Sequence, residues 1–432
     1  MDYLKKLTKK IFQYEAQLVL RKYKPKIIAV IGSVGKTLTK EAIYLAISKK
    51  FFVRKSEKSF TTELGIPLTI IGCPQGVGSI LQWAKNILFA VRLLLFKANY
   101  PEWLILEIDA DKPGDLESLS PWFRPDILVI TAIGEVPSHI ESFSDIENLL
   151  SEKRQIINSI KSDGKIIYNT DDSVTRKLLD GVNQVKISCG VSSDCNVSGS
   201  SFTLLYSTEK SEHIPTGMSF EILYDSKKYL TNLFQTIGIQ NEYACLIAFA
   251  VGLEFGLKPS EIITSLNKYT SLPGRMNIIS GIKNTVIIDD SYNSSPIAMS
   301  QALDVFFSIK TSGRKIVVLG DMLELGKYSA EEHRKLAILL KDSMDKIICV
   351  GLRMRKVSEE LLKIGWNESD VISVDTANEA VGELQKLIKE GDVVLIKGSQ
   401  AMRMEKVVLE IMRHPEDKKK LLVRQEKEWL ER

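Results

Sequence analysis

Short apolar runs rich in β-branched residues recur along the chain of 432 residues, and stretches of helical character separate them. They occur at residues 27–31, 103–108, 127–130, 165–168, 286–288, 315–319, 346–350 and 393–396. A strand that is apolar along its whole length is buried on both faces, which is typical of a parallel sheet covered by helices. The alternation therefore predicts an α/β fold with mostly parallel sheets.

The first of these runs leads into a glycine loop, Gly32-Ser33-Val34-Gly35-Lys36-Thr37, and a helix is expected at residues 40–48. Backbone N–H groups of such a loop and the helix N-terminus cradle phosphates, the lysine reaches the β- and γ-phosphates, and the threonine hydroxyl binds Mg²⁺. The eight-residue form of the motif has a glycine where this chain has Val30. The match is to the shorter GxxGKT form, and it predicts a phosphate-binding loop.

Two further residues are candidates for this site. Glu107 stands near the end of an apolar run, and a carboxylate at the carboxyl end of a parallel strand beside such a loop is well placed to hold Mg²⁺. His139 is the other candidate, because the chain has only four histidines. The remaining three are expected to be surface residues (His213, His414) or a packing residue (His333).

Local composition and turn signals divide the chain into parts. Residues 186–234 carry short alternating stretches among Ser, Thr and Gly, which predicts a small antiparallel insertion. The turn signal Leu272-Pro273-Gly274-Arg275 precedes a new series of strands. We therefore expect an N-terminal helical segment (1–24), a central phosphate-binding domain with the insertion (25–273) and a C-terminal Rossmann-like α/β domain (274–432).

Composition excludes several classes of protein. The balance of 58 basic and 54 acidic residues gives a net charge of only +4, so there is no electrostatic footprint for nucleic acid. The five cysteines form no CxxC pair, which indicates reduced thiols in the cytoplasm rather than a disulfide framework or a zinc ribbon. The N-terminal sequence is too charged for a secretory signal.

An apolar helix expected at residues 79–96 bears on localisation. Gln82, Lys85 and Arg92 are expected to form a narrow polar stripe on an otherwise apolar surface. Three interpretations stay open: a helix buried or covered by a partner protein, a helix lying in the plane of the inner membrane surface, and a spanning helix. A charge near the bilayer centre costs roughly 2.5–3.5 kcal/mol, which disfavours the third.

Ordered motifs from residue 28 to residue 408 resemble those of the Mur ligases, and most those of the members that add D-alanyl-D-alanine. Besides the glycine loop they are Glu63-Leu64-Gly65-Ile66-Pro67-Leu68, Glu107 with Ala110 and Pro113-Gly114-Asp115, Arg124-Pro125-Asp126, His139-Ile140-Glu141-Ser142-Phe143, Lys153, Asn169-Thr170-Asp171, Pro273-Gly274-Arg275, Asp289-Asp290-Ser291-Tyr292-Asn293, Leu319-Gly320-Asp321-Met322-Leu323-Glu324-Leu325-Gly326 and the segment from Lys397 to Glu405.

The resemblance implies an ATP-dependent ligase that forms an amide through an acyl phosphate, joining D-alanyl-D-alanine to a muramoyl-peptide precursor in peptidoglycan synthesis. It implies Lys36, His139 and Lys153 as catalytic residues, and two Mg²⁺ ions, one on Thr37 and Glu107 and one on His139 and a carbamate formed by CO₂ on Lys153. The implied nucleotide contacts are Gly32, Ser33, Val34, Gly35, Lys36, Thr37, Asn169, Arg275 and Asp290. The segment from Lys397 to Arg403 and the loop at Asp321 are implied to shape the amine side.

Departures from the family pattern concern the acceptor. Only 31 residues precede Gly32, so we expect one helix there rather than the family's UDP-binding domain. Thr61-Thr62, Gln240-Asn241 with Ala244, and Ser295 stand where the family has other residues. A ligase with a non-UDP or lipid-linked acceptor, and a P-loop ATPase without ligase activity, therefore remain alternatives. Because the implied catalytic residues are all present, the sequence disfavours an inactive scaffold protein.

Overall fold

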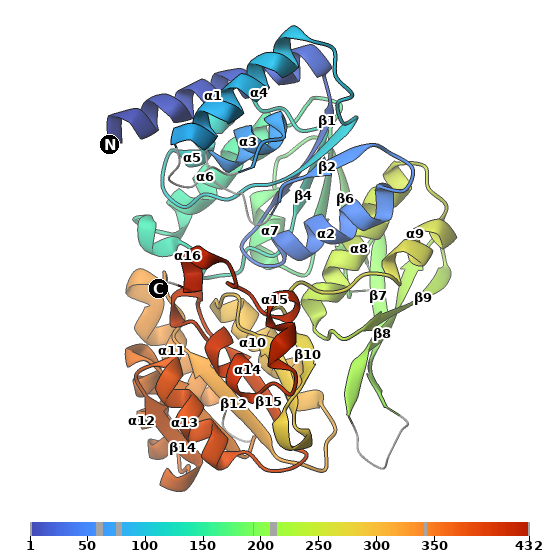
Figure 1. Cartoon of the computed structure of the whole chain (residues 1–432). Helices are drawn as coiled ribbons and strands as arrows, with labels where there is room; N and C mark the ends of the chain where they lie inside the picture. Colours follow the sequence, from blue (N-terminus) through green and yellow to red (C-terminus); the bar gives the residue numbers. More distant parts are fainter. Residues whose placement is uncertain are drawn as a thin grey trace.

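The structure, a computed structural model, describes residues 2–57, 64–74, 80–192, 194–207, 214–340 and 344–430. Thr61, Thr62, Glu63, residue 79 and His213 lie outside the described residues. The described chain forms two helix-covered sheets that lie one above the other in Figure 1.

The first sheet has the strand order β2-β3-β1-β4-β5-β6-β7-β8-β9. Its strands are β1 (Lys26–Ile31), β2 (Val53–Lys55), β3 (Trp103–Glu107), β4 (Ile127–Ile130), β5 (Lys165–Asn169), β6 (Val185–Gly190), β7 (Val197–Tyr206), β8 (Pro215–Tyr224) and β9 (Lys227–Phe234). Neighbours from β2 to β7 pair in parallel, and β7, β8 and β9 form an antiparallel extension.

Helices cover both faces of the first sheet (Figure 1). One face carries α2 (Lys36–Ile47), α8 (Ile239–Glu254) and α9 (Pro259–Leu266), and the other carries α1 (Asp2–Tyr23), α3 (Gly65–Ile71), α4 (Ile80–Leu95), α5 (Asp115–Leu119), α6 (Ile146–Ser159) and α7 (Ser173–Leu178). Ile28 and Val30 of β1 pack on the first face, whereas Ile27, Ala29 and Ile31 pack on the second. This burial on both faces explains why β1 is an uninterrupted apolar run.

The second sheet has the order β10-β11-β15-β12-β13-β14 and is parallel except for the β10–β11 pair. Its strands are β10 (Asn277–Ser280), β11 (Val286–Asp290), β12 (Lys315–Gly320), β13 (Lys346–Val350), β14 (Val371–Val374) and β15 (Val393–Lys397). Its helices are α10 (Pro296–Ser308), α11 (Ser329–Leu339) and α12 (Leu352–Lys363) on one face and α13 (Ala377–Leu387) and α14 (Glu405–Ile411) on the other, followed by α15 (Lys418–Leu421) and α16 (Lys427–Leu430).

The predicted fold class, including the antiparallel insertion, is confirmed. Each of the eight apolar runs becomes a strand, within a few residues of its expected ends. The sequence analysis missed the short strands β2, β10 and β14, and β6, which it expected within the antiparallel insertion, instead pairs in parallel with β5. The division at residues 24 and 273 stays a prediction; the turn at 272–275 lies between α9 and β10.

Helices α1 and α4 lie side by side on the outer side of the first sheet and run in the same direction (Figure 1). The rings of Phe12 and Trp83 are 5.9 Å apart, and Lys22 Nζ donates to the Leu94 carbonyl at 2.9 Å. The expected polar stripe is wrong in one member, because Gln82 is partly buried and donates to Asn86. Among the described residues, no helix has the length and apolar character that crossing a bilayer requires.

Candidate active site

The glycine loop is shaped by its contact with the end of β4. Gly32 has φ +144°, and a Cβ there would collide with the Thr131 hydroxyl. The N–H groups of Ser33 and Val34 donate to the Ala132 carbonyl at 2.8 and 3.0 Å. Gly35, at φ +86°, then begins α2, whose first turn presents backbone N–H groups that have no partner within the helix. This arrangement is suited to binding phosphate.

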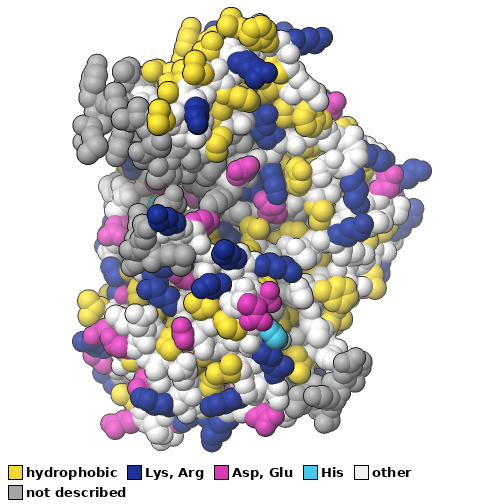
Figure 2. Space-filling model, in the orientation of Figure 1, with side chains coloured by type: hydrophobic (Ala, Val, Ile, Leu, Met, Phe, Trp, Pro, Cys, Tyr) yellow, Lys and Arg dark blue, Asp and Glu magenta, His cyan; other side chains and the backbone are white. Residues whose placement is uncertain are grey.

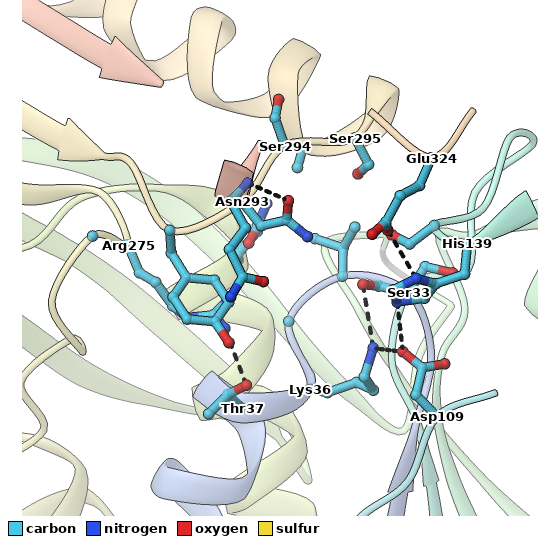
Figure 3. A pocket seen from close by; sticks show the side chains of 18 of the residues that line it. Ser33, Lys36, Thr37, Asp109, His139, Arg275, Asn293, Ser294, Ser295 and Glu324 are labelled. Atoms are coloured by element: carbon cyan, nitrogen blue, oxygen red, sulfur yellow. Dashed lines mark hydrogen bonds and ion pairs between the residues drawn. The ribbon is translucent and has the colours of Figure 1, made fainter. Parts of the chain in front are cut away.

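The loop forms one wall of a cavity of about 570 Å³, and the second sheet forms the opposite wall (Figure 3). The carboxyl ends of β1 and β3 face the carboxyl ends of β11 and β15 across this cavity. The lining residues are Ser33, Val34, Gly35, Lys36, Thr37, Glu107, Asp109, Asp111, Ser138, His139, Glu141, Ser142, Gln240, Gly274, Arg275, Asp290, Tyr292, Asn293, Ser294, Ser295, Ala298, Glu324, Lys397 and Gln400.

Two lysines converge on one buried carboxylate. Lys36 Nζ lies 2.6 Å from one Asp109 oxygen, and Lys153 Nζ lies 3.1 Å from the other. Both ammonium groups also donate to the Gly32 carbonyl, at 3.0 and 3.2 Å. Burial by itself would raise the pKa of Asp109, but the charges of Lys153 and Lys36 hold it well below its usual range. Burial lowers the pKa of Lys153, and Asp109 opposes that shift.

Thr37 and Glu107 form the second contact of the loop. The Thr37 hydroxyl donates to Glu107 Oε1 at 2.9 Å, and Arg275 Nη2 from the opposite wall donates to the same hydroxyl oxygen at 3.1 Å. The other Glu107 oxygen is buried without a hydrogen-bond partner and lies 3.4 Å from Lys40 Nζ. A hydroxyl and an under-satisfied carboxylate side by side are oxygen ligands that suit Mg²⁺.

His139 links the two walls through a residue far along the chain. Its Nδ1 lies 2.8 Å from Glu324 Oε2, and the Glu141 N–H donates to the Glu324 carbonyl at 3.1 Å. Burial would lower the pKa of His139, but the hydrogen bond with Glu324 and the charge of Asp109 raise it above its ordinary value. The same hydrogen bond lowers the pKa of Glu324. The pair therefore joins the loops of the two sheets.

Side-chain contacts also hold together the cavity wall that the second sheet forms. Lys397 Nζ lies 2.6 Å from Asp290 Oδ2, because the two residues are register partners at the ends of β15 and β11. The guanidinium of Arg275 stacks over the Tyr292 ring at 4.1 Å. Arg424, from the segment after α15, donates to the Ser291 carbonyl at 3.1 Å. The stacking on Tyr292 holds Arg275 on this wall, from which it reaches Thr37.

Two family models match the chain. The model of the Mur ligase middle domain matches residues 30–252, and the model described as Mur ligase, glutamate ligase domain, matches residues 274–400. The chain belongs to the Mur ligase family. Both matched regions line the cavity. The middle-domain region contributes the glycine loop, and the other region contributes Arg275, Asp290 and Lys397.

Curated relatives of this Mur ligase include UDP-N-acetylmuramoyl-tripeptide--D-alanyl-D-alanine ligases. That of Bacillus subtilis (strain 168) is 28% identical over 410 residues, which cover 93% of this chain and 79% of the relative. That of Escherichia coli (strain K12) is 24% identical over 410 residues, covering 93% and 80%.

Solved structures share the fold. MurF ligase from Thermotoga maritima, crystallised in complex with ADP, has a TM-score of 0.74 at 24% identity and covers 93% of this chain and 82% of that structure. MurF from Acinetobacter baumannii has a TM-score of 0.74 at 23% identity and covers 92% and 79%.

Most of the expected site residues of this Mur ligase line the cavity, but Gly32, Lys153 and Asn169 are not among its lining residues. Asn169 lines a second cavity of about 390 Å³, where its side-chain oxygen accepts from the Asp171 N–H at 2.9 Å. The two cavities adjoin at the start of α10, and Gln240 Nε2 of the first donates to Gln301 Oε1 of the second at 3.2 Å. Asn169 and the glycine loop are therefore near different parts of one crevice.

The segment from Lys397 to Arg403 and the loop at Asp321 reach the cavity in part, through Lys397, Gln400 and Glu324, and their role on the amine side stays a prediction. Asp321 does not reach the cavity, because its carboxylate accepts from the N–H groups of Arg353 and Met354 at 3.0 and 2.8 Å and caps α12. Arg403 also lies outside the lining and pairs with Glu405. His333 is buried and bonded to backbone at both ring nitrogens, as expected of a packing residue, and His414 is exposed.

The sequence analysis missed several residues that the structure brings into the cavity: Asp109, Asp111, Glu324, Ser294 and Gln240. Asp109 and Asp111 alternate with Glu107 at the end of β3, and this i, i+2, i+4 pattern of carboxylates was a usable signal. Ser33, Ser294 and Ser295 carry buried hydroxyls without a hydrogen-bond partner, so the cavity presents unsatisfied polar groups to a ligand (Figure 3). Glu324 belongs to one of the motifs that resemble the family, but the sequence did not indicate its contact with His139.

The residues fit one implied Mg²⁺ better than the implied carbamate. Thr37 and Glu107 offer the pair of oxygens described above. Lys153 is buried with a lowered pKa, as carbamate formation needs, but its Nζ lies beside the ionised Asp109, and a carbamate would place a second anion there. In the described part of the chain, no three His, Cys, Asp or Glu residues are grouped to hold a metal ion. The carbamate therefore does not fit this arrangement, and the second Mg²⁺ stays a prediction.

Proposed function

We propose that this Mur ligase uses ATP to join D-alanyl-D-alanine to the carboxylate of a muramoyl-peptide precursor of peptidoglycan. The names of the relatives support the substrates. One geometric observation carries the reaction type: Lys36 stands at the start of α2 on one wall of the cavity, and Arg275 reaches the neighbouring Thr37 from the opposite wall. Phosphoryl transfer requires positive charge around the transferring oxygens, and these two side chains supply it from both sides.

The nucleotide is proposed to lie along the crevice. Its triphosphate would occupy the first cavity, against the glycine loop and the N-termini of α2 and α10. Its base would occupy the second cavity, beside Asn169 and Tyr243. The ADP bound to the Thermotoga maritima relative supports nucleotide binding by this fold. Mg²⁺ held by Thr37 and Glu107 would neutralise charge on the β- and γ-phosphates.

The proposed chemistry takes place in two steps. A carboxylate oxygen of the acceptor attacks the γ-phosphorus, so that ADP leaves and an acyl phosphate forms. The amine of D-alanyl-D-alanine then attacks the acyl carbon, and the tetrahedral intermediate expels inorganic phosphate and loses a proton to give the amide. Lys36 and Arg275 stabilise the oxygens in transfer, while contact between the walls through His139 and Glu324 excludes water that would hydrolyse the acyl phosphate. The five free cysteines agree with a cytoplasmic location.

A coupled assay tests this function. Phosphate release is measured with ATP and UDP-muramoyl tripeptide, with and without D-alanyl-D-alanine, and the amide product is identified by mass spectrometry. We expect release and product only when all three substrates are present. Activity with a lipid-linked or other non-UDP acceptor alone would replace the acceptor but keep the reaction. Phosphate release without any amide product would indicate an ATPase and refute the ligase proposal.

Arg275→Ala is expected to weaken nucleotide binding by roughly 10- to 100-fold, because a hydrogen bond to a charged group is worth about 1.5–3 kcal/mol. The dissociation constant of ATP is measured by calorimetry. Arg413→Ala is the matched control, since Arg413 is an exposed arginine that does not line the cavity. Equal affinity in Arg275→Ala and the parent would remove Arg275 from the nucleotide site.

Lys153 is expected to remain an unmodified ammonium, paired with Asp109. Protein equilibrated with ¹³C-bicarbonate should show no lysine carbamate resonance in ¹³C NMR, and ligation should not depend on added bicarbonate. The Asp109→Asn variant serves as a comparison, because it removes the anion that disfavours the carbamate. A carbamate signal in the parent protein that disappears in Lys153→Arg would contradict this assignment.

A further inference from the structure

The outward surface of α4 is apolar and exposed. Leu81, Leu88, Leu95 and Phe96 are between 64% and 76% exposed, and Phe89 and Val91 flank them at 45% and 39%. Lys85 and Arg92 are exposed on the same surface. The sequence spacing from Leu81 through Lys85, Leu88 and Arg92 to Leu95 places these five residues along one line of the helix. We call these eight residues the outer face of α4.

The opposite side of α4 already provides its packing within the protein. Asn86, Ala90 and Leu93 are buried there, and Asn86 Nδ2 donates to the Pro74 carbonyl at 2.8 Å. The end of the helix is fixed by Tyr23, whose hydroxyl donates to the Leu93 carbonyl at 2.8 Å. The outer face is therefore not needed to hold α4 in place. A contiguous exposed apolar surface of this kind marks an interaction site.

The charges around the outer face are basic. No acidic residue occurs in α4, and Lys97 is the second residue after its end. The neighbouring helix α1 adds exposed cations (Lys10, Arg21, Lys22), and residues 1–26 contain eight Lys or Arg against two acids, of which Glu15 is buried. Figure 2 shows hydrophobic side chains with Lys and Arg among them over the α1 and α4 region. The surface is complementary to an extended anionic partner.

A second copy of the chain is a poor occupant of this surface. In a two-fold contact the same face meets itself, and antiparallel α4 helices centred on Leu88 would bring Lys85 of each copy close to Arg92 of the other. Such like charges repel at the centre of an apolar contact. An anionic lipid surface has no such conflict, because phosphate groups and acyl chains lie next to each other in it.

We propose that the outer face of α4 binds the surface of an anionic bilayer, with the helix in the plane of the membrane. The leucines and phenylalanines enter the boundary between headgroups and acyl chains. Lys85 and Arg92 extend their long side chains to lipid phosphates, as such residues do at membrane surfaces. This proposal concerns a surface away from the cavity and does not depend on which acceptor the ligase uses.

Flotation with lipid vesicles tests it. We expect the full chain to float with vesicles that contain anionic phosphatidylglycerol and to remain largely unbound with pure phosphatidylcholine vesicles. The double variant Leu88→Asp/Leu95→Asp should lose binding, and Lys85→Glu/Arg92→Glu should weaken it at least about tenfold. Leu352→Asp is the matched control, because Leu352 is 70% exposed on α12, at the other end of the molecule in Figure 1.

Phosphate release with soluble substrates and thermal unfolding are measured for every variant. We expect both to match the parent, since none of the changed residues lines the cavity or packs in the core. Failure of the parent to bind anionic vesicles would overturn the proposal. So would equal binding by the parent and both double variants, or light scattering that shows a dimer which the double variants abolish. Loss of ligase activity in the parent preparation would bear on the proposed function and not on this surface.

Discussion

Lys36→Ala is expected to reduce amide formation by at least about 100-fold, because removal of one preorganised charge stabiliser costs on the order of 10²–10³ in rate. Lys36 is the glycine-loop residue whose ammonium group reaches both the loop carbonyl of Gly32 and the carboxylate of Asp109. When a nucleotide binds, this ammonium group is expected to reach its β- and γ-phosphates. The measurement is the rate of phosphate release together with product formation at saturating substrates.

Lys50→Ala is the matched control for this prediction. Lys50 belongs to the turn after α2 and forms an exposed ion pair with Glu261 at 2.8 Å, away from the cavity. Such a pair contributes about 0–1 kcal/mol to stability, so the control should retain activity. Near-normal amide formation by Lys36→Ala would refute the assignment of the glycine loop as the phosphate site.

Asp109→Asn is expected to lower the free energy of unfolding by about 3–5 kcal/mol, the usual cost of removing one partner from a buried ion pair. Asp109 is 6% exposed and is the carboxylate shared by Lys36 and Lys153. Without it, two buried ammonium groups lie near each other with no counter-charge. Urea unfolding followed by circular dichroism measures the change, and ligation should fall as well because Lys36 loses its anchor.

Asp111→Asn separates this effect from a general loss of acidic charge. Asp111 is 48% exposed and lies 3.8 Å from His139 Nε2, so its replacement should change stability by less than about 1 kcal/mol. Similar losses in both variants would show that Asp109 is not the centre of the lysine pair. An Asp109→Asn protein with the same free energy of unfolding as the parent would lead to the same conclusion.

The predictions for Lys36→Ala and Asp109→Asn both depend on the charges around the glycine loop. Near the glycine loop, the cations Lys36, Lys40, Lys153 and Arg275 outnumber the carboxylates Asp109 and Glu107, so this side of the cavity favours an anion. Glu107 and Thr37 form a separate pair of oxygens on the same wall. The cations and the Mg²⁺ ligands thus stand next to each other at the ends of β1 and β3, where open α/β sheets bind their ligands.

The sequence alone determined the fold class and the loop. Runs such as 27–31 and 393–396 are apolar at every position, and only strands covered on both faces tolerate that pattern. Gly32 and Gly35 stand where the backbone takes φ values that favour glycine, so the loop is fixed by local chemistry. Glu107 was predictable because the end of its strand must lie beside the end of β1 in a parallel sheet.

Only the tertiary structure decided which charged groups meet. Asp109 joins Lys36 to Lys153 because α6 packs beside the glycine loop, and His139 meets Glu324 because the loop after β12 contacts the segment before α6. No local pattern encodes contacts between residues so far apart along the chain. The orientation of α4 was decided in the same way. Its helical period was evident from the sequence, but the packing of Asn86 and Leu93 determines that the side with Leu88, Lys85 and Arg92 faces outward, because a helix buries the side that its neighbours cover.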